Sequence, residues 1–435
     1  MKEVNVLLIS TYELGHHPFG LASAKAWLAR DGHRVDSADL SVDRLPDPRT
    51  AGLIAFYLPM HTATRLAAKV IEKVRRLNPR AHLCCYGLYA PLNESYLRGI
   101  GAGTILGGEF EPGLVALADG LKPESTTSLD RLQFRVPLRS GLPPLAKYAG
   151  LHVDGGVKRT GYTEASRGCK HLCRHCPVVP VYQGNFRVVQ PDIVLADIRQ
   201  QITAGAQHIT FGDPDFFNGP THAMRIVDAL HREFPKVTYD ATIKIEHLLK
   251  HRALLPRLRE TGCLFVTSAV ESTDDAVLAK LDKGHTRADF IEVANEFRRV
   301  GLTLAPTFIP FTPWTTLEQY REMLALLVDL DLVEHVAPVQ LALRLLIPSG
   351  SRMLELADVQ AVIQEFDEPA LLYRWRHPDP AMDALAEQAL RIAASKGSRR
   401  EIFGYLWNLV DERPFENLDL LPRAAVPYLD EPWFC

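Results

Sequence analysis

The sequence predicts an α/β protein built from two successive arrays of strands and helices. Three observations support this fold class. Short strand-like segments alternate with helix-like segments over the first 120 residues, the alternation stops in a proline-containing stretch, and it resumes from Arg159. Continuous apolar strands separated by helices are typical of parallel sheets covered on both faces. A length of 435 residues is enough for two or three domains.

Residues 1–121 form the first predicted domain. Strands are expected at Val4–Ser10, Arg34–Leu40, Leu53–Leu58, Leu83–Tyr86 and Gly103–Leu106. Helices are expected at Leu21–Asp31, Thr62–Leu77 and Glu111–Leu121. This order predicts a doubly wound, Rossmann-like parallel sheet.

Residues 122–158 are predicted to be a linker, because they contain several prolines and no long periodic segment. The second array, residues 159–355, holds six βα-like units. Its expected strands are Thr163–Ser166, His208–Gly212, Val237–Ile243, Leu264–Val270, Leu302–Ile309 and Val339–Ile347. Its expected helices are Asp192–Ala204, Thr221–Phe234, Leu248–Thr261, Arg287–Val300 and Leu317–Leu330. The pattern predicts an open, partial (β/α)6 barrel with its chemistry at the carboxyl ends of the strands.

The last region, residues 356–435, is predicted to be small and mainly helical, with its plainest helical pattern at Met382–Ala394. It ends in a proline-rich arm without periodicity.

The composition argues against several classes of partner. Lys and Arg number 49 against 52 Asp and Glu, a net charge of −3, so nothing indicates a nucleic-acid or anionic-membrane surface. No apolar run reaches the roughly 18 residues of a membrane helix. The short run Val4–Ile9 has no cleavage site behind it and is interpreted as a strand rather than a signal peptide. We therefore expect a cytoplasmic protein.

Three of the seven cysteines form the most informative motif in the chain. Cys169, Cys173 and Cys176 are spaced C-x₃-C-x₂-C just after a predicted strand. Soft thiolates favour iron–sulfur clusters, and three of them leave the fourth corner of a cube open to a ligand. The alternative is a zinc site with His171 or His175 as the fourth ligand.

This spacing and position resemble the radical S-adenosylmethionine (SAM) superfamily. The resemblance implies that the three cysteines hold a 4Fe–4S cluster and that the open iron chelates SAM. It also implies that one electron from the reduced cluster cleaves a carbon–sulfur bond of SAM and gives a 5′-deoxyadenosyl radical. Family members usually have an aromatic residue before the last cysteine, where this chain has His175.

The resemblance extends over residues 159–350 and implies a set of SAM contacts. Gly212, Asp213 and Pro214 occupy the place of the segment that meets the SAM ammonium group, and an ordinary turn is the alternative. Glu271 and Ser272, at the end of the fourth barrel strand, are the candidates for the ribose, and a surface charge that caps the next helix is the alternative. Arg344, in the sixth strand, is placed near the SAM carboxylate, with a structural salt bridge as the alternative.

The N-terminal domain resembles the cobalamin-binding domain of one radical SAM subclass. His17 and Gly20 match part of the Asp-x-His-x-x-Gly motif whose histidine ligates cobalt, but Gly15 replaces the aspartate. Gly108 and Glu109 belong to a turn that resembles the subclass's "GE-E" turn. The resemblance therefore implies bound cobalamin, with or without His17 as a ligand. A vestigial or substrate-binding domain of the same fold is the alternative.

The chain ends at Cys435, after Pro432, Trp433 and Phe434. This ending resembles radical SAM proteins with a Cys-Cys-Ala-Glu-Pro or Cys-selenocysteine-Ala-Glu-Pro tail. It suggests that the reading frame was ended at a selenocysteine codon; an accidental terminal cysteine is the alternative.

These features predict a radical SAM enzyme, with cobalamin, that transfers a methyl group or performs a related radical modification. Its partners would be a small-molecule or peptide substrate and a reductant such as flavodoxin or ferredoxin. One alternative is transfer of the 3-amino-3-carboxypropyl group of SAM to arsenic, selenium or sulfur. The other is a non-catalytic protein that binds metal or senses redox state.

Overall fold

The N-terminal sheet of the computed structural model is parallel and six-stranded, in the order β2-β1-β3-β4-β5-β6. The structure describes residues 3–418, 420 and 426–430. The strands are β1 (Asn5–Ser10), β2 (Arg34–Asp39), β3 (Leu53–Tyr57), β4 (His82–Tyr86), β5 (Thr104–Gly108) and β6 (Thr127–Ser128). The helices are α1 (Phe19–Arg30), α2 (His61–Leu77), α3 (Tyr89–Leu92), α4 (Glu94–Gly99) and α5 (Glu111–Ala118). The predicted doubly wound domain is confirmed.

The order of this sheet determines where it can bind a ligand. β1 pairs with both β2 and β3, so the connections run in opposite directions on the two sides of β1. In open α/β sheets the ligand crevice lies outside the carboxyl ends of the strands at such a switch point. A ligand crevice is therefore expected at the loops after β1 and β3.

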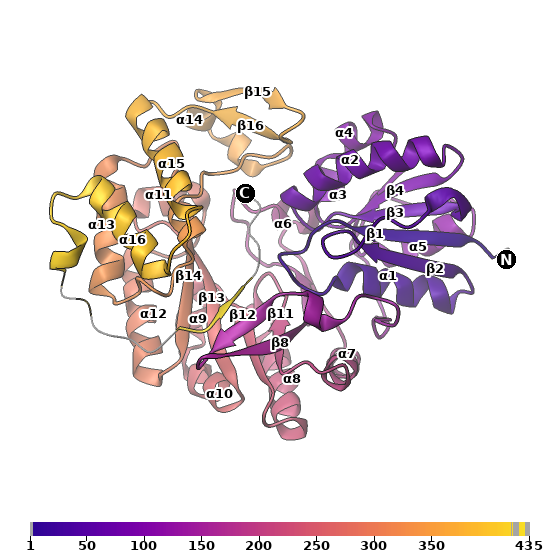
Figure 1. Ribbon diagram of the computed structural model, residues 1–435, viewed down its shortest axis with the longest axis horizontal. Coiled ribbons are helices and arrows are strands. Elements are labelled where there is room, and N and C mark those ends of the chain that lie inside the picture. The colour runs from indigo at the N-terminus through magenta and orange to yellow at the C-terminus, as the bar shows by residue number, and fades with distance from the viewer. Residues whose placement is uncertain (1–2, 419, 421–425, 431–435) are drawn as a thin grey trace.

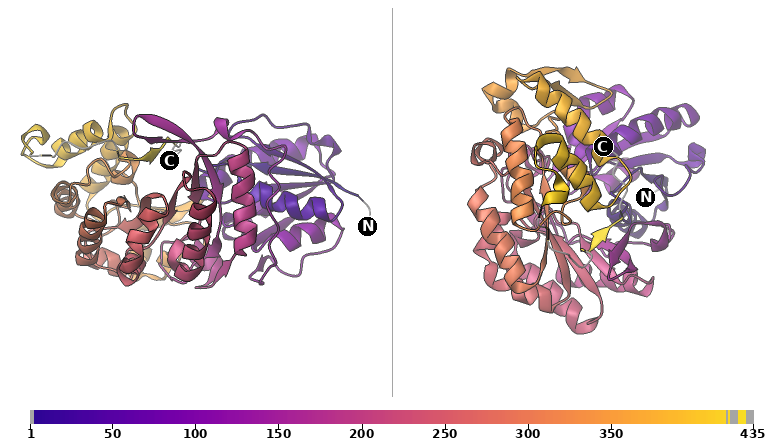
Figure 2. Two further views of the ribbon diagram at one scale, coloured as in Figure 1. Left: turned by 90° about the horizontal axis from the view of Figure 1, so that it is seen from below. Right: turned by 60° about the vertical axis from the view of Figure 1, so that its left-hand side comes forward.

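The second sheet has the order β14-β13-β12-β11-β8-β7-β17. Its parallel strands are β8 (Gly156–Thr163), β11 (His208–Phe211), β12 (Thr238–Thr242), β13 (Cys263–Glu271) and β14 (Thr303–Phe308). The helices between and after them include α7 (Pro191–Thr203), α8 (Pro220–Glu233), α11 (Asp275–Leu281), α12 (Arg287–Val300) and α13 (Leu317–Asp329). Figure 1 shows the two sheets side by side, and Figure 2 shows helices in a row on the outside of the second sheet.

Alternation along the barrel strands separates an apolar outer face from a polar inner face. Ile209 and Phe211 of β11 are buried in the main hydrophobic core. His208 and Thr210, which alternate with them, both hydrogen-bond to Asp240 of β12. Successive strand residues point to opposite faces, so the polar residues line the inside of the curl.

The sixth predicted barrel strand, Val339–Ile347, does not form. Residues Pro338–Leu341 are a 3₁₀-helix, and the sixth position is represented by one parallel bridge between Phe311 and Arg344. Pro338 starts the 3₁₀ turn and cannot donate a ladder hydrogen bond. The helix predicted at Leu248–Thr261 is also divided, into α9 (Ile245–Lys250) and α10 (Leu255–Glu260), the second with a proline in its first turn.

Part of the predicted linker belongs to the second sheet. β7 (Gly150–Val153) pairs antiparallel with β8, which begins well before the expected Thr163. The two strands are joined at Asp154 and Gly155, both with positive φ. Asp-Gly between strand-like segments is a strong hairpin signal, and it lies within residues 122–158.

The C-terminal region contains more strand than predicted. Helices α15 (Pro380–Ala393) and α16 (Arg399–Val410) confirm its helical character. They follow the hairpin β15 (Ile363–Asp367) and β16 (Leu372–Trp375), while β17 (Tyr428–Leu429) joins the edge of the second sheet beside β7. Cys435 lies outside the described residues. None of the described helices is long and apolar enough to cross a membrane.

Candidate functional site

The three-cysteine loop follows a short strand that faces the N-terminal domain. Strand β9 (Ser166–Gly168) leads into the loop, and helix α6 (Val178–Tyr182) follows it. Gly168 has φ +74°, and a Cβ atom there would collide with the Tyr182 ring. Glycine allows this sharp turn, which a larger residue would block. The three predicted cysteine ligands are all free thiols.

Polar groups surround the sulfur atoms. The Sγ of Cys169 lies 3.8 Å from Oδ1 of Asn218, and the Nζ of Lys244 lies 3.7 Å from Sγ of Cys173. Burial, together with the neighbouring Cys173 and Cys169, raises the pKa of Cys176 to about 12. Thiols bind metals as thiolates, so a metal cluster in this loop would be bound by the deprotonated sulfurs.

The two histidines of the loop have different surroundings. One ligand atom each from Cys169, His171 and Asp215 lie within 4.8 Å of one another, a set that omits the other two cysteines. His175 instead turns its Nε2 to Oε1 of Glu271, at 3.1 Å. A single zinc ion at the first set would leave two of the three spaced thiols unused, whereas a cluster uses all three.

Asp213 supports the start of the loop rather than lining open space. Its carboxylate accepts hydrogen bonds from the Ala165 backbone N–H at 2.9 Å and from the Ser166 hydroxyl at 2.5 Å. Burial raises the pKa of Asp213 to about 7, although these hydrogen bonds lower it. A Cβ atom at Gly212 would collide with the Tyr162 ring, so the β11 turn packs directly on β8.

Glu271 is a buried anion at the carboxyl end of β13. Its Oε1 accepts from Lys283 at 3.4 Å and from His175 at 3.1 Å. Burial alone raises the pKa of Glu271, but Lys283 and His175 outweigh it and lower the pKa to about 2. The φ of Glu271 is +69°, an uncommon value that marks a constrained position. Ser272, in contrast, accepts from the Asp274 backbone and caps a turn.

Arg344 is engaged with the C-terminal region. Its guanidinium donates to Asp383 at 2.7 Å and lies 3.9 Å from the centre of the Trp375 ring. This is the structural salt bridge that the sequence left open as the alternative role.

His17 has partners at both ring nitrogens. Arg139 donates to Nδ1 at 2.7 Å, and Nε2 lies 3.0 Å from the carbonyl of Pro143. Burial, and then the charge of Arg139, lower the pKa of His17 to about 3. Gly20 lies where a Cβ atom would collide with the Tyr57 ring. His17 therefore contacts Arg139 and Pro143, and Gly20 packs against Tyr57.

The turn containing Gly108 and Glu109 holds an arginine from the barrel. Gly108 has φ +64°. Arg167 of β9 donates to Glu109 at 3.2 Å, to Glu111 at 2.7 Å and to Glu164 at 2.8 Å. Burial raises the pKa of Glu109 to about 7 although Arg167 lowers it. The two domains are therefore joined by a buried charge network that adjoins the cysteine loop.

A cleft between the domains brings the two halves of the site together. It contains about 810 Å³ of space not filled by protein, part of it open to solvent. Its lining combines loops at the carboxyl ends of both sheets: Glu13, Leu14, His16, Tyr57, Pro59, Met60, Gly87, Leu88, Gly108 and Phe110 from the N-terminal side, and Tyr162, Glu164, Ser166, Arg167, Gly168, Val178, Tyr182, Gly212 and Pro214 from the barrel side. Of the predicted residues, Gly108, Gly212 and Pro214 line it.

Lys244 was not predicted from the sequence. It lies beside the cysteine loop, and its signal was a lysine between two isoleucines directly after a strand. Lys283 lies beside the same loop in a turn, and Glu13 lies in the loop after β1; neither residue was assigned a role of its own from the sequence. Glu13 is buried in the cleft with no hydrogen-bond partner for its Oε2, and this burial depends on the second domain.

Residues 163–327 match the Radical SAM superfamily. A tRNA-2-methylthio-N(6)-dimethylallyladenosine synthase of Geobacter sulfurreducens is 24% identical over 188 residues, 40% of this chain and 40% of that protein. A Thermus thermophilus protein of the same name is 24% identical over 284 residues, 59% of this chain and 56% of that protein. The chain thus spans about two fifths to three fifths of these relatives' lengths.

Two solved structures share the architecture of most of the chain. The radical SAM methyltransferase TsrM from Kitasatospora setae, with tryptophan and aza-SAM bound, has a TM-score of 0.71 at 16% identity and covers 90% of each chain. The cobalamin-dependent radical enzyme OxsB, with aqua-cobalamin and SAM bound, has a TM-score of 0.66 at 14% identity, over 89% of this chain and 66% of that one. Residues 163–327 therefore match the Radical SAM superfamily, and most of the chain shares its fold with TsrM and the cobalamin-dependent enzyme OxsB.

Proposed function

We propose that this chain is a radical SAM enzyme that binds cobalamin in the cleft and transfers a methyl group or performs a related radical modification. One observation supports this most directly: the cleft is lined both by the turn into the cysteine loop, at Gly168, and by the strand ends of the N-terminal domain, at Tyr57 and Gly108. A cofactor on the N-terminal sheet would therefore face the cluster and SAM.

The cluster ligands in this proposal are Cys169, Cys173 and Cys176. The donor set fits a 4Fe–4S cluster, because three mutually interacting thiols lie in one loop with polar groups at their sulfurs. When reduced, such a cluster supplies the electron that cleaves a carbon–sulfur bond of bound SAM. A flavodoxin or ferredoxin is the proposed source of that electron.

The barrel strand ends are proposed to bind SAM. Glu271 is anionic and buried at the end of β13, so it can accept hydrogen bonds from ribose hydroxyls. Gly212 and Pro214 bring backbone to the cleft. Asp213 acts indirectly in this proposal, since its carboxylate holds Ala165 and Ser166 ahead of the cysteines.

The cleft has the features expected of a cobalamin site. Its lining is largely apolar and aromatic, which suits a corrin ring. Glu13 faces it with one carboxyl oxygen unpaired, and burial, with Glu164 and Asp39, raises the pKa of Glu13 well above its usual value. A neutral carboxyl can donate to a corrin amide. His17, with both nitrogens engaged, is not proposed as a cobalt ligand.

The substrate is proposed to be a small molecule or peptide. The relatives named above modify tRNA, but they match less than two thirds of their length, and the net charge of −3 offers little to a polyanion. The comparisons give no support to the aminocarboxypropyl or sensor alternatives.

The test is the mass spectrum of SAM products after anaerobic reconstitution with iron, sulfide and hydroxocobalamin, followed by dithionite. 5′-Deoxyadenosine formed by the wild type and absent from Cys173→Ala supports the proposal; S-adenosylhomocysteine would accompany it if cobalamin is methylated by SAM. Cys263→Ala, which alters a buried cysteine outside the loop, is the matched control. Methylthioadenosine as the main product, or no cleavage by protein with a full cluster, would contradict it.

A further inference from the structure

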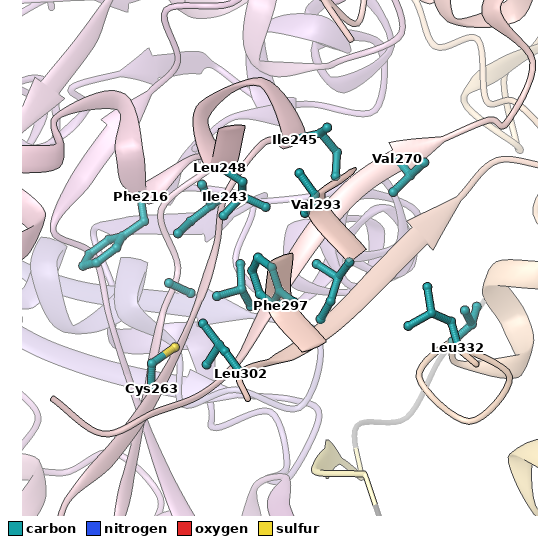
Figure 3. Packing of buried hydrophobic residues seen from close by; sticks show 14 of the residues in the cluster. Phe216, Ile243, Ile245, Leu248, Cys263, Val270, Val293, Phe297, Leu302 and Leu332 are labelled. Atoms are coloured by element: carbon teal, nitrogen blue, oxygen red, sulfur yellow. The ribbon is translucent and has the colours of Figure 1, made fainter. Parts of the chain in front are cut away.

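Two buried lysines lie beside the cysteine loop. Lys244 follows β12 and is 7% exposed. Its neighbours Ile243 and Ile245 are both fully buried in the main hydrophobic core, as Figure 3 shows. With both isoleucines in the core, the side chain between them is directed to Cys173, whose Sγ is 3.7 Å from its Nζ.

Lys283 reaches the same sulfurs from another element. It follows α11 and is 3% exposed. Its Nζ lies 3.4 Å from Oε1 of Glu271. Burial lowers the pKa of Lys283, but Glu271, Cys173 and Cys176 outweigh burial and raise it. The ammonium group is therefore near two of the three sulfurs.

The polypeptide alone does not account for both charges. A buried ammonium group costs several kcal/mol unless an anion lies beside it. Lys283 has buried Glu271, whereas the carboxylate near Lys244 is Glu246, 3.6 Å away with a side chain that is 42% exposed. A negatively charged group on Cys173 would give Lys244 a buried anionic partner.

We propose that Lys244 and Lys283 set the reduction potential of the cluster, by stabilising the extra negative charge of its reduced form. This inference rests on the proposed function, because it requires a cluster on the three cysteines. Net charge and hydrogen bonds to the sulfurs are the protein's main means of tuning such potentials. Lys244 acts as a cation whose carboxylate neighbour, Glu246, is partly exposed, and Lys283 acts as a cation partly offset by buried Glu271.

The positions of these charges predict in which direction each substitution shifts the midpoint potential of the cluster. Removing either lysine charge disfavours the reduced state, so the midpoint potential becomes more negative. Removing the charge of Glu271 has the opposite effect. At separations of 4–6 Å in a partly polar interior, one charge changes the equilibrium constant for reduction by about tenfold or more, which is about 59 mV for one electron.

The experiment is a potentiometric titration of reconstituted protein without SAM, followed by electron paramagnetic resonance (EPR) of the reduced cluster. Lys244→Met is expected to lower the potential by about 59 mV or more, and Lys244→Arg, which keeps the charge, to restore most of it. Lys250→Met, an exposed lysine in the next helix, is the matched control and is expected to leave the potential unchanged.

The outcomes separate this inference from the proposed function. A wild type that assembles no cluster would overturn the proposed function. A wild type with a cluster whose potential is the same in Lys244→Met would overturn the inference alone. If Lys244→Met assembles no cluster, Glu271→Gln decides: a more positive potential supports the inference, and an unchanged or more negative one overturns it.

Discussion

The two sides of the cleft are organised differently. On the barrel side, the cysteine sulfurs have polar side chains beside them: Asn218 at Cys169 and Lys244 at Cys173. On the N-terminal side, the motif-like His17 is engaged by Arg139 and Pro143. The cysteine motif places its three residues in one loop, whereas His17 matches only part of a longer motif and has protein partners at both ring nitrogens. Both ligand assignments stay predictions.

The largest expected effect is at the ligand loop. Cys169→Ala, Cys173→Ala and Cys176→Ala should each abolish the assembled cluster, because three thiolates are needed for three corners of the cube. Iron content and visible absorbance after anaerobic reconstitution measure this. Cys263→Ala should retain the wild-type iron content. Normal iron in all three loop variants would remove the basis of the proposed site.

A large loss of stability is expected at the link between the two sides. Arg167→Met leaves the buried Glu109 and Glu111, and the partly buried Glu164, without their cation, a change that costs about 3–5 kcal/mol. Urea denaturation followed by circular dichroism measures it. Arg257→Met, at an exposed ion pair, should leave the stability nearly unchanged. Equal losses in the two variants would show that the network does not join the domains.

A pH-dependent effect is expected at Asp213. Its pKa is raised to about 7 by burial. The folded state therefore binds its proton more tightly than the unfolded state does, and this contribution to stability is present in acid and is lost as pH rises towards 7. Asp213→Asn should become more stable relative to wild type as pH rises from 4 to 7, by about 1.4 kcal/mol for each unit of pKa difference. A pH-independent difference between them would contradict the raised pKa.

No spectroscopic change is expected on substitution of His17. His17→Gln should leave the EPR spectrum of bound cob(II)alamin unchanged, because both ring nitrogens already have protein partners. Its loss of stability should be about 1–3 kcal/mol, from the hydrogen bonds left unsatisfied. Nitrogen hyperfine splitting that is present in wild type and lost in the variant would show that His17 ligates cobalt.

The sequence predicted the elements whose signal is local. Helix Arg287–Val300 has the predicted bounds, and it has a capping box at Thr286. The prediction of a sixth strand was wrong. Residues 339–347 are apolar enough for a strand, but the segment begins with a 3₁₀ turn that starts at Pro338. The β7–β8 hairpin was missed, although the Asp154-Gly155 pair is a strong sequence signal for a hairpin turn.

The site could be predicted only in part for a related physical reason. The three cysteines lie within one short segment, Cys169 to Cys176, so their spacing alone brings them together. The ion-pair partners of Arg167 come from two segments, the turn with Glu109 and Glu111 and the strand end at Glu164, and the contact of Lys244 with Cys173 depends on how β12 meets the loop. Such contacts are set by tertiary packing, which no spacing in the sequence encodes.

The most direct test of the central claim is a metal analysis of the chain after anaerobic reconstitution with iron, sulfide and hydroxocobalamin and removal of unbound cofactors. The account predicts about four iron atoms for each chain, as a cubic cluster requires, together with a near-equal molar amount of cobalt and chain. Bound zinc in place of iron would contradict the cluster. Iron without cobalt would contradict the proposed role of the cleft.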